Sequence, residues 1–118
     1  MVYRFENLEV WKLARNFVNV VYTITKEFPA DEKFSLTSQL RRAALSILLN
    51  ISEGCDRNSD KDFTRFLRMS LTSLHEVIAA CYVALDQGYI SKDRFNFIYN
   101  KSEIIAKKIY SLIKYLNK

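Results

Sequence analysis

Apolar residues recur every three or four positions in four long stretches of the chain, and short polar segments separate these stretches. This spacing places the apolar residues on one face of a helix, so each stretch predicts an amphipathic helix. We expect the first helix from about Asn7 to Glu27 and the second from about Leu36 to Gly54. The third follows a charged loop at 56–62 and ends near Gly88, and the fourth begins after Ser91.

Residues that commonly begin and end helices lie at these boundaries. Ser59 or Asp60 can cap the third helix, and Ser91 can cap the fourth, by accepting a hydrogen bond from a free backbone N–H. We expect Gly54 to adopt the left-handed conformation that ends the second helix, and Gly88 to end the third.

The shortage of turn residues excludes most folds built from sheets. Only two glycines and one proline occur in 118 residues, whereas a sheet needs a turn every 8 to 12 residues, roughly. Short connections make consecutive helices antiparallel. The sequence therefore predicts an all-α fold, an antiparallel up-down-up-down four-helix bundle, with residues 1–118 forming one domain.

The second helix carries apolar residues on two faces. Leu40 and Ile47 lie on the face that the bundle core would cover, while Leu45, Leu48 and Leu49 extend the apolar surface to another face. One bundle core cannot cover both faces, so the second face is expected to meet another subunit. Self-association is therefore the first functional prediction, with Leu48 and Leu49 in the contact.

Polar residues are set among these apolar positions. Arg41, Arg42, Asn50 and Glu53 could form hydrogen bonds and ion pairs between helices or between subunits, or they could contact nucleic acid. We favour the first interpretation. An amide inside an apolar helix, such as that of Asn50, is also typical of a residue that fixes the register of packed helices.

Some of these residues form a recognisable pattern: Gln39-Leu-Arg-Arg-Ala43, Ser46-Ile47, Asn50-Ile-Ser-Glu-Gly54 and Arg57. The pattern resembles the proteins encoded by intervening sequences within bacterial 23S ribosomal RNA genes. That family is also similar to the accessory variability determinant of diversity-generating retroelements. The resemblance spans nearly the whole chain and implies a homopentamer of four-helix bundles with a role in binding nucleic acid.

The positive charge of the chain is concentrated in its last quarter. The net charge is +5, and residues 91–118, with seven basic and two acidic residues, account for all of it. The sequence places the basic face opposite the apolar seam of the fourth helix, where phosphates can approach it. Its candidate binding residues are Lys107, Lys108, Lys114 and Lys118, with Arg57 and Arg65 in reserve. The alternative is a solvated face that keeps the bundle soluble.

No group of residues indicates catalysis. His75 and Glu76 are adjacent and point about 100° apart on a helix, so they cannot act as an oriented pair. Asp60 and Asp62 lack the other ligands of a calcium loop. We expect no enzyme activity, no cofactor and no metal.

The chain shows no export signal and no apolar run near 18 residues. We therefore expect a cytoplasmic protein without a membrane segment, in which Cys55 and Cys81 are reduced thiols. Two functions stay open. One is an oligomer that binds RNA or DNA non-specifically through its fourth helix, and the other is a protein-interaction scaffold with no nucleic-acid role.

Overall fold

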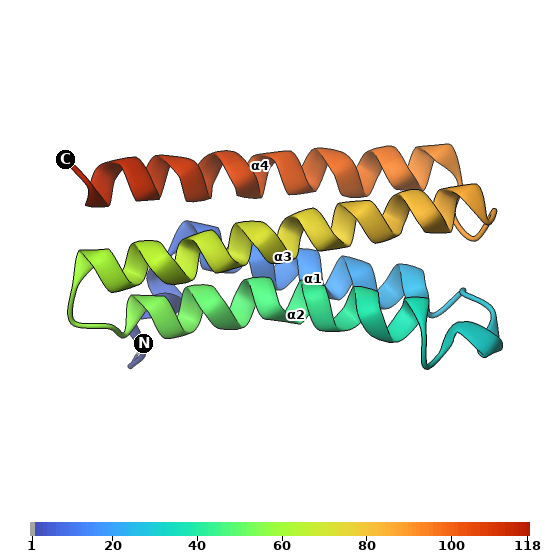
Figure 1. Cartoon of the computed structure of the whole chain (residues 1–118), viewed down its shortest axis with the longest axis horizontal. Helices are drawn as coiled ribbons and strands as arrows, with labels where there is room; N and C mark the ends of the chain where they lie inside the picture. The colour runs from blue at the N-terminus through green and yellow to red at the C-terminus, as the bar shows by residue number, and fades with distance from the viewer. Residues whose placement is uncertain (1) are drawn as a thin grey trace.

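The computed structural model describes residues 2–118 and contains four long helices (Figure 1). They are α1 (Glu9–Thr25), α2 (Leu36–Cys55), α3 (Asp60–Asp86) and α4 (Lys92–Leu116), and two short 3-10 helices, η1 (Arg4–Asn7) and η2 (Ala30–Glu32), precede α1 and α2. The helices form a bundle that extends 44 × 23 × 22 Å along its principal axes. The predicted all-α up-down-up-down four-helix bundle is confirmed.

Each helix contacts two neighbours. α1 packs against α2 and α4, and α3 packs against the same two helices, so α2 and α4 lie diagonally across the bundle. Both ends of the drawn chain and the turn between α2 and α3 lie at one end of the bundle, which we call the termini end (Figure 1). α2 and α4 both run toward the termini end, and α3 runs away from it.

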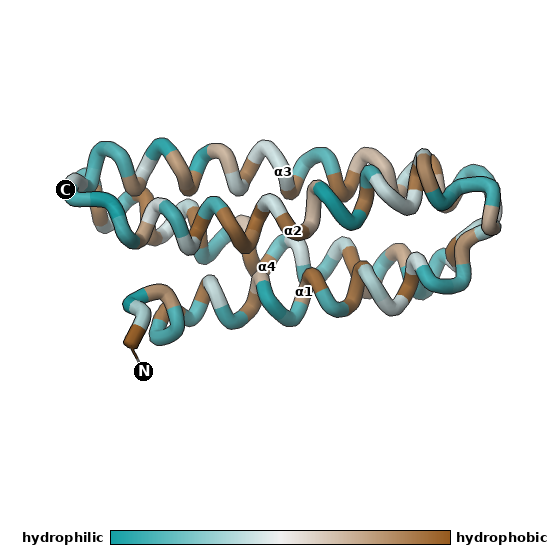
Figure 2. The backbone as a smooth tube through the Cα atoms, turned by 90° about the horizontal axis from the view of Figure 1, so that it is seen from below, coloured by the Kyte–Doolittle hydropathy of each residue, from teal (hydrophilic) through white to brown (hydrophobic). Residues whose placement is uncertain are grey.

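The core is built from the periodic apolar positions that the sequence predicts. Along each helix, hydrophobic and hydrophilic segments alternate (Figure 2). The most deeply buried large side chains include Phe17, Ile47, Leu67, Ile105 and Ile109, which come from all four helices.

Three of the predicted helix-boundary residues are confirmed. The Ser59 hydroxyl accepts a hydrogen bond from the Asp62 N–H at 3.1 Å, and the Ser91 hydroxyl accepts one from the Arg94 N–H at 3.1 Å. Gly88 lies just past the end of α3, as expected, and its φ of +76° is the left-handed conformation that ends many helices. The prediction for Gly54 is wrong, because this residue lies inside α2, one position before the helix ends.

Gly54 instead allows α3 to approach α2 closely. A Cβ atom at this position would lie 2.7 Å from the Phe66 Cβ and 3.0 Å from the Phe63 Cδ1. Farther along the same helix pair, the buried Ser70 hydroxyl donates to the Ile47 carbonyl at 2.9 Å. Small residues therefore hold α2 and α3 together, through a close contact and a hydrogen bond that larger side chains would prevent.

We expect Gly54→Ala to destabilise the protein. An alanine in an exposed helix is about 1 kcal/mol more favourable than a glycine. Here the added methyl would overlap the Phe66 Cβ, which cannot rotate away, and overpacking of this kind costs about 1 to 3 kcal/mol. Urea unfolding followed by circular dichroism measures the free energy of unfolding.

Ser111→Ala, at an exposed position of α4, is the control and should change the unfolding free energy little. A Gly54→Ala variant that is more stable than the original chain would show that α2 and α3 do not approach closely at this point.

Candidate nucleic-acid interface

Two predicted lysines lie on the outer side of α4, and a third, Lys118, lies two residues beyond the end of this helix. Core residues such as Ile105 and Ile109 occupy the inner side of this helix, so Lys107, Lys114 and Lys118 are exposed. We call these three residues the α4 basic face. Within residues 2–118, no acidic side chain lies within 4.0 Å of the amino groups of Lys107 and Lys114. Their charges are therefore available to phosphates.

Lys108 occupies a different position from the one expected. It lies on the side of α4 that faces α1, where its Nζ is 3.2 Å from the Glu9 Oε1. Arg94 pairs in the same way with Glu27, which lies two residues after the end of α1. Lys108 therefore links α4 to α1 and contributes less free charge than the α4 basic face.

Of the reserve candidates, Arg57 lies in the turn between α2 and α3, and Arg65 lies in the second turn of α3. The guanidinium carbons of Arg57 and Arg65 lie 4.7 and 4.6 Å from the centre of the Phe66 ring. Each arginine also has an acidic partner: Glu53 lies 2.5 Å from Arg57, and Asp62 lies 3.7 Å from Arg65. Their charges are partly neutralised within the chain.

The structure nevertheless places Arg65 at the same end of the bundle as the last lysines of α4. The Asn117 side chain donates to the Thr64 hydroxyl at 3.0 Å, so the end of α4 lies beside the start of α3. Basic groups from two helices therefore gather at the termini end, a grouping that the sequence analysis treated as two separate sets.

The predicted polar set around α2 divides into separate contacts. Arg41 Nε donates to the Thr25 hydroxyl at 2.9 Å, and its guanidinium carbon lies 4.7 Å from the centre of the Tyr22 ring. This arginine therefore fastens α2 to α1. Arg42, one position later, is exposed on the outer side of α2.

Asn50 belongs to the contact between α2 and α3. Its Nδ2 donates to the Ser46 hydroxyl at 3.0 Å, and the Ser73 hydroxyl donates to the same oxygen at 2.9 Å. Asn50 is half-buried, which is less than the buried amide expected. Ser70 and Ser73 bond to α2 from α3 and were not among the predicted residues, although small polar residues three apart in an apolar helix are a usable signal.

The second apolar face of α2 is narrower than predicted. Leu48 is half-buried and packs against the bundle core. The exposed apolar side chains are Leu45, with 37% of its surface accessible, and Leu49, with 54%. An uncovered leucine pair on one helix is consistent with a contact surface.

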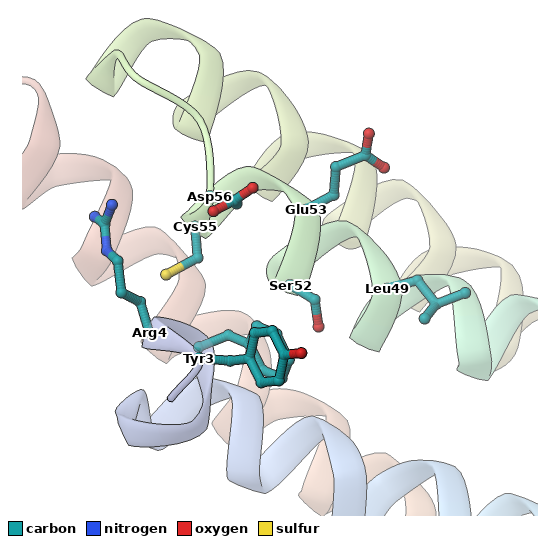
Figure 3. Close-up of a pocket in the computed structure, with 8 residues that line it drawn as sticks. Tyr3, Arg4, Leu49, Ser52, Glu53, Cys55 and Asp56 are labelled. Carbon is teal, nitrogen blue, oxygen red and sulfur yellow. The ribbon is translucent and has the colours of Figure 1, made fainter. Parts of the chain in front are cut away.

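Leu49 also borders an open hollow of about 510 Å³ between η1 and the end of α2. Ser52 and Cys55 point toward the N-terminal segment in this hollow, while Glu53 points away from it (Figure 3). The residues that line it are Tyr3, Arg4, Phe5, Leu49, Ser52, Glu53, Cys55 and Asp56.

Both cysteines are free and buried. Burial raises the pKa of the Cys81 thiol to about 12, because the charged thiolate would lose its hydration. Burial also raises the pKa of Cys55, although the nearby Arg4 charge acts in the opposite direction. Neither thiol is therefore ionised near neutral pH.

Two further properties concern the part of the chain that the structure covers. Among residues 2–118, no three His, Cys, Asp or Glu side chains come together as a metal site requires. None of the helices in this range combines the length and the apolar character needed to cross a membrane.

Comparison with known proteins identifies relatives of this fold and sequence. The family model described as "23S rRNA-intervening sequence protein" matches residues 6–111. The chain is also similar to the crystal structure of a protein with unknown function from the S23 ribosomal protein family of Bacteroides thetaiotaomicron. The two share 26% sequence identity with a TM-score of 0.82, and the match covers 89% of this chain and 95% of that one. No curated protein matches this chain.

The raised thiol pKa values predict slow alkylation of the folded protein. The thiolate is the reactive form, so at pH 8 iodoacetamide should leave Cys55 and Cys81 of the native chain unmodified while both react fully in guanidinium. Raising the pH to 9 should leave Cys81 unmodified, because its pKa is about 12. Mass spectrometry of the intact chain counts the added groups. Rapid native modification of Cys81 would contradict its burial.

Proposed function

This chain belongs to the 23S rRNA-intervening sequence protein family, and from that premise we propose that it is a non-enzymatic oligomer that binds RNA or DNA without sequence specificity. The observation that carries this proposal is the α4 basic face, in which Lys107 and Lys114 are exposed on one side of α4 and Lys118 is exposed just beyond its end. Lysine side chains in such a row can follow the phosphates of a nucleic-acid backbone.

The geometry favours contact with the backbone over recognition of bases. The α4 basic face is the convex outer side of a helix that is held in a bundle, and its long side chains carry their charges into solvent. Phosphate contacts of this kind position a nucleic acid but do not distinguish sequences. Affinity should therefore depend strongly on salt, because each phosphate that is neutralised releases bound counterions.

Self-association would strengthen this binding. We propose a homopentamer, the number of subunits that the family resemblance implies, and the exposed Leu45 and Leu49 support a contact between chains. With a net charge of +5 per chain, five chains would carry about +25. The similarity to the accessory variability determinant and a cytoplasmic location remain predictions.

A protein-interaction scaffold is the second candidate function. It is favoured by the pairing of Lys108, Arg57 and Arg65 with acidic side chains of the same chain, which leaves fewer free charges for phosphates. The uncovered leucines of α2 would then serve protein partners. The two candidates differ in whether the protein binds polyanions at low salt.

Reversing two charges of the α4 basic face tests the first candidate. Lys107→Glu combined with Lys118→Glu should weaken binding to single-stranded RNA and DNA of unrelated sequences by similar factors, about tenfold at low salt. The slope of log affinity against log salt should fall by about one for each phosphate that the variant no longer neutralises. Fluorescence anisotropy measures the affinity, and light scattering verifies that the assembly is retained.

The control is Lys26→Glu combined with Lys33→Glu, which changes the net charge equally at the opposite end of the bundle. An equal loss of affinity in both double variants would mean that only the total charge matters. If the original protein binds no polyanion at low salt, the scaffold function is the better account.

A charge at Leu49 tests self-association. Leu49→Glu should lower the assembled fraction at micromolar concentration, because a carboxylate buried without a partner in a contact costs several kcal/mol. Phe34→Glu is the control, since Phe34 is 89% exposed on the connector between α1 and α2. Size exclusion gives the assembled fraction, and circular dichroism verifies folding. A Leu49→Glu variant that assembles normally would remove Leu49 from the contact.

A further inference from the structure

A row of residues with exposed side chains follows the outer side of α2. Its members are Ser38, Arg42, Leu45, Leu49 and Glu53, which are separated by four, three, four and four positions. This spacing keeps them on one side of the helix. The middle of the row is apolar. A cation, Arg42, lies toward the far end of the row, and an anion, Glu53, lies at the end nearest the termini end.

A second row with the same spacing follows α4. Its members are Tyr99, Glu103, Ala106, Tyr110 and Lys114. Tyr99, Glu103 and Ala106 line an open groove of about 400 Å³ together with the α3 residues Ile78 and Tyr82. The order of charges is opposite to that of the α2 row: the anion, Glu103, lies in the first half of the row, and the cation, Lys114, lies at the termini end.

The two rows lie at the same level, meaning the same height along the long axis of the bundle. Ser46 of α2 is hydrogen-bonded to Ser73 of α3, and the neighbouring Leu74 lines the same groove as Ala106 of α4. Leu45 and Ala106 are therefore at about the same level. Because α2 and α4 run in the same direction, the equal spacing places Arg42 level with Glu103.

Continuing toward the termini end, the same spacing places Leu49 level with Tyr110 and Glu53 level with Lys114. Each of these residues of one row thus has a complementary residue at its own level in the other row. Within one chain, residues 2–118 bring no part of α2 into contact with α4, so the two rows face different directions.

We propose that the α2 row of one copy packs in parallel against the α4 row and the α3–α4 groove of the next copy. This proposal rests on the self-association proposed above and specifies its two surfaces. Arg42 would pair with Glu103. Glu53 would be shared between Arg57 of its own chain and Lys114 of the next copy. Leu45 and Leu49 would pack against Ala106 and Tyr110 between the two pairs. The arrangement has the apolar centre and charged rim that are common in protein interfaces.

Using two different surfaces has a geometric consequence. When bundles lie side by side with parallel axes, all copies lie at the same height along the axis. Complementary residues on the two surfaces must therefore lie at equal heights, as those of these rows do. A contact between unlike surfaces repeats from copy to copy and closes into a ring when the rotation between copies allows it. It also engages Lys114 with Glu53 of the next copy, whereas Lys118 lies beyond the end of the α2 row and stays open to phosphates.

Cysteine cross-linking tests the pairing directly. The double variant Leu49→Cys with Tyr110→Cys is treated with a short bismaleimide and analysed on a denaturing gel. It should form a ladder of linked chains that ends at the number of subunits, because each copy is joined to two others. The native Cys55 and Cys81 are buried and should not take part. Each single variant should give no ladder.

The outcomes separate this proposal from self-association itself. A single Leu49→Cys variant that forms linked dimers would show that α2 meets α2, which contradicts the proposed pairing. A protein that light scattering shows to be assembled, but whose double variant forms no links, would also overturn it while self-association stands. A monomeric original protein would overturn both.

Exchanging one charge pair provides an independent measurement. Arg42→Glu alone and Glu103→Arg alone should each weaken association about tenfold or more, because like charges then face each other. The combination Arg42→Glu with Glu103→Arg should restore association. Arg42→Glu with Asp86→Arg, which makes the same net change in charge, should not restore it. Equal recovery in both combinations would contradict the pairing of Arg42 with Glu103.

Discussion

The close packing of α2 against α3 determines where the proposed contact surfaces of this protein lie. Gly54 leaves room for Phe66, and the hydroxyls of Ser70 and Ser73 bond to α2, so the two helices have one register. α3 also packs antiparallel to α4, which makes it the link that sets α2 and α4 at matching levels. The packing of α2 against α3 thus fixes the positions of the exposed leucines of α2 and of the groove beside α4, although it is not itself part of either surface.

Most of the fold could be predicted from the sequence because it depends on local pattern. Apolar spacing located the four helices and their buried faces, and Ser59, Ser91 and Gly88 marked helix ends through bonds and dihedral angles within a few residues. Gly54 was misread for a physical reason. A glycine near the end of a helix can serve a left-handed turn or a close contact, and only the position of Phe66, twelve residues away across a turn, decides between them.

The candidate site could be predicted only in part. The exposure of Lys107 and Lys114 follows from helical spacing alone. The pairing of Lys108 with Glu9 and of Arg41 with Thr25 depends on which helices become neighbours and at what level. For the same reason, spacing could not separate Leu48, which packs on its own bundle, from the exposed Leu49. Contacts between distant segments set the register of one helix against another, and this register determines which partners each side chain can reach.

We have proposed that identical copies of this bundle form a closed assembly. Native mass spectrometry of the original protein, sprayed from a volatile buffer at micromolar concentration, tests that claim most directly. We expect one dominant species with the mass of five chains and little signal at intermediate numbers, because a ring gains its last contact only on closure. A spectrum dominated by the mass of a single chain would contradict it.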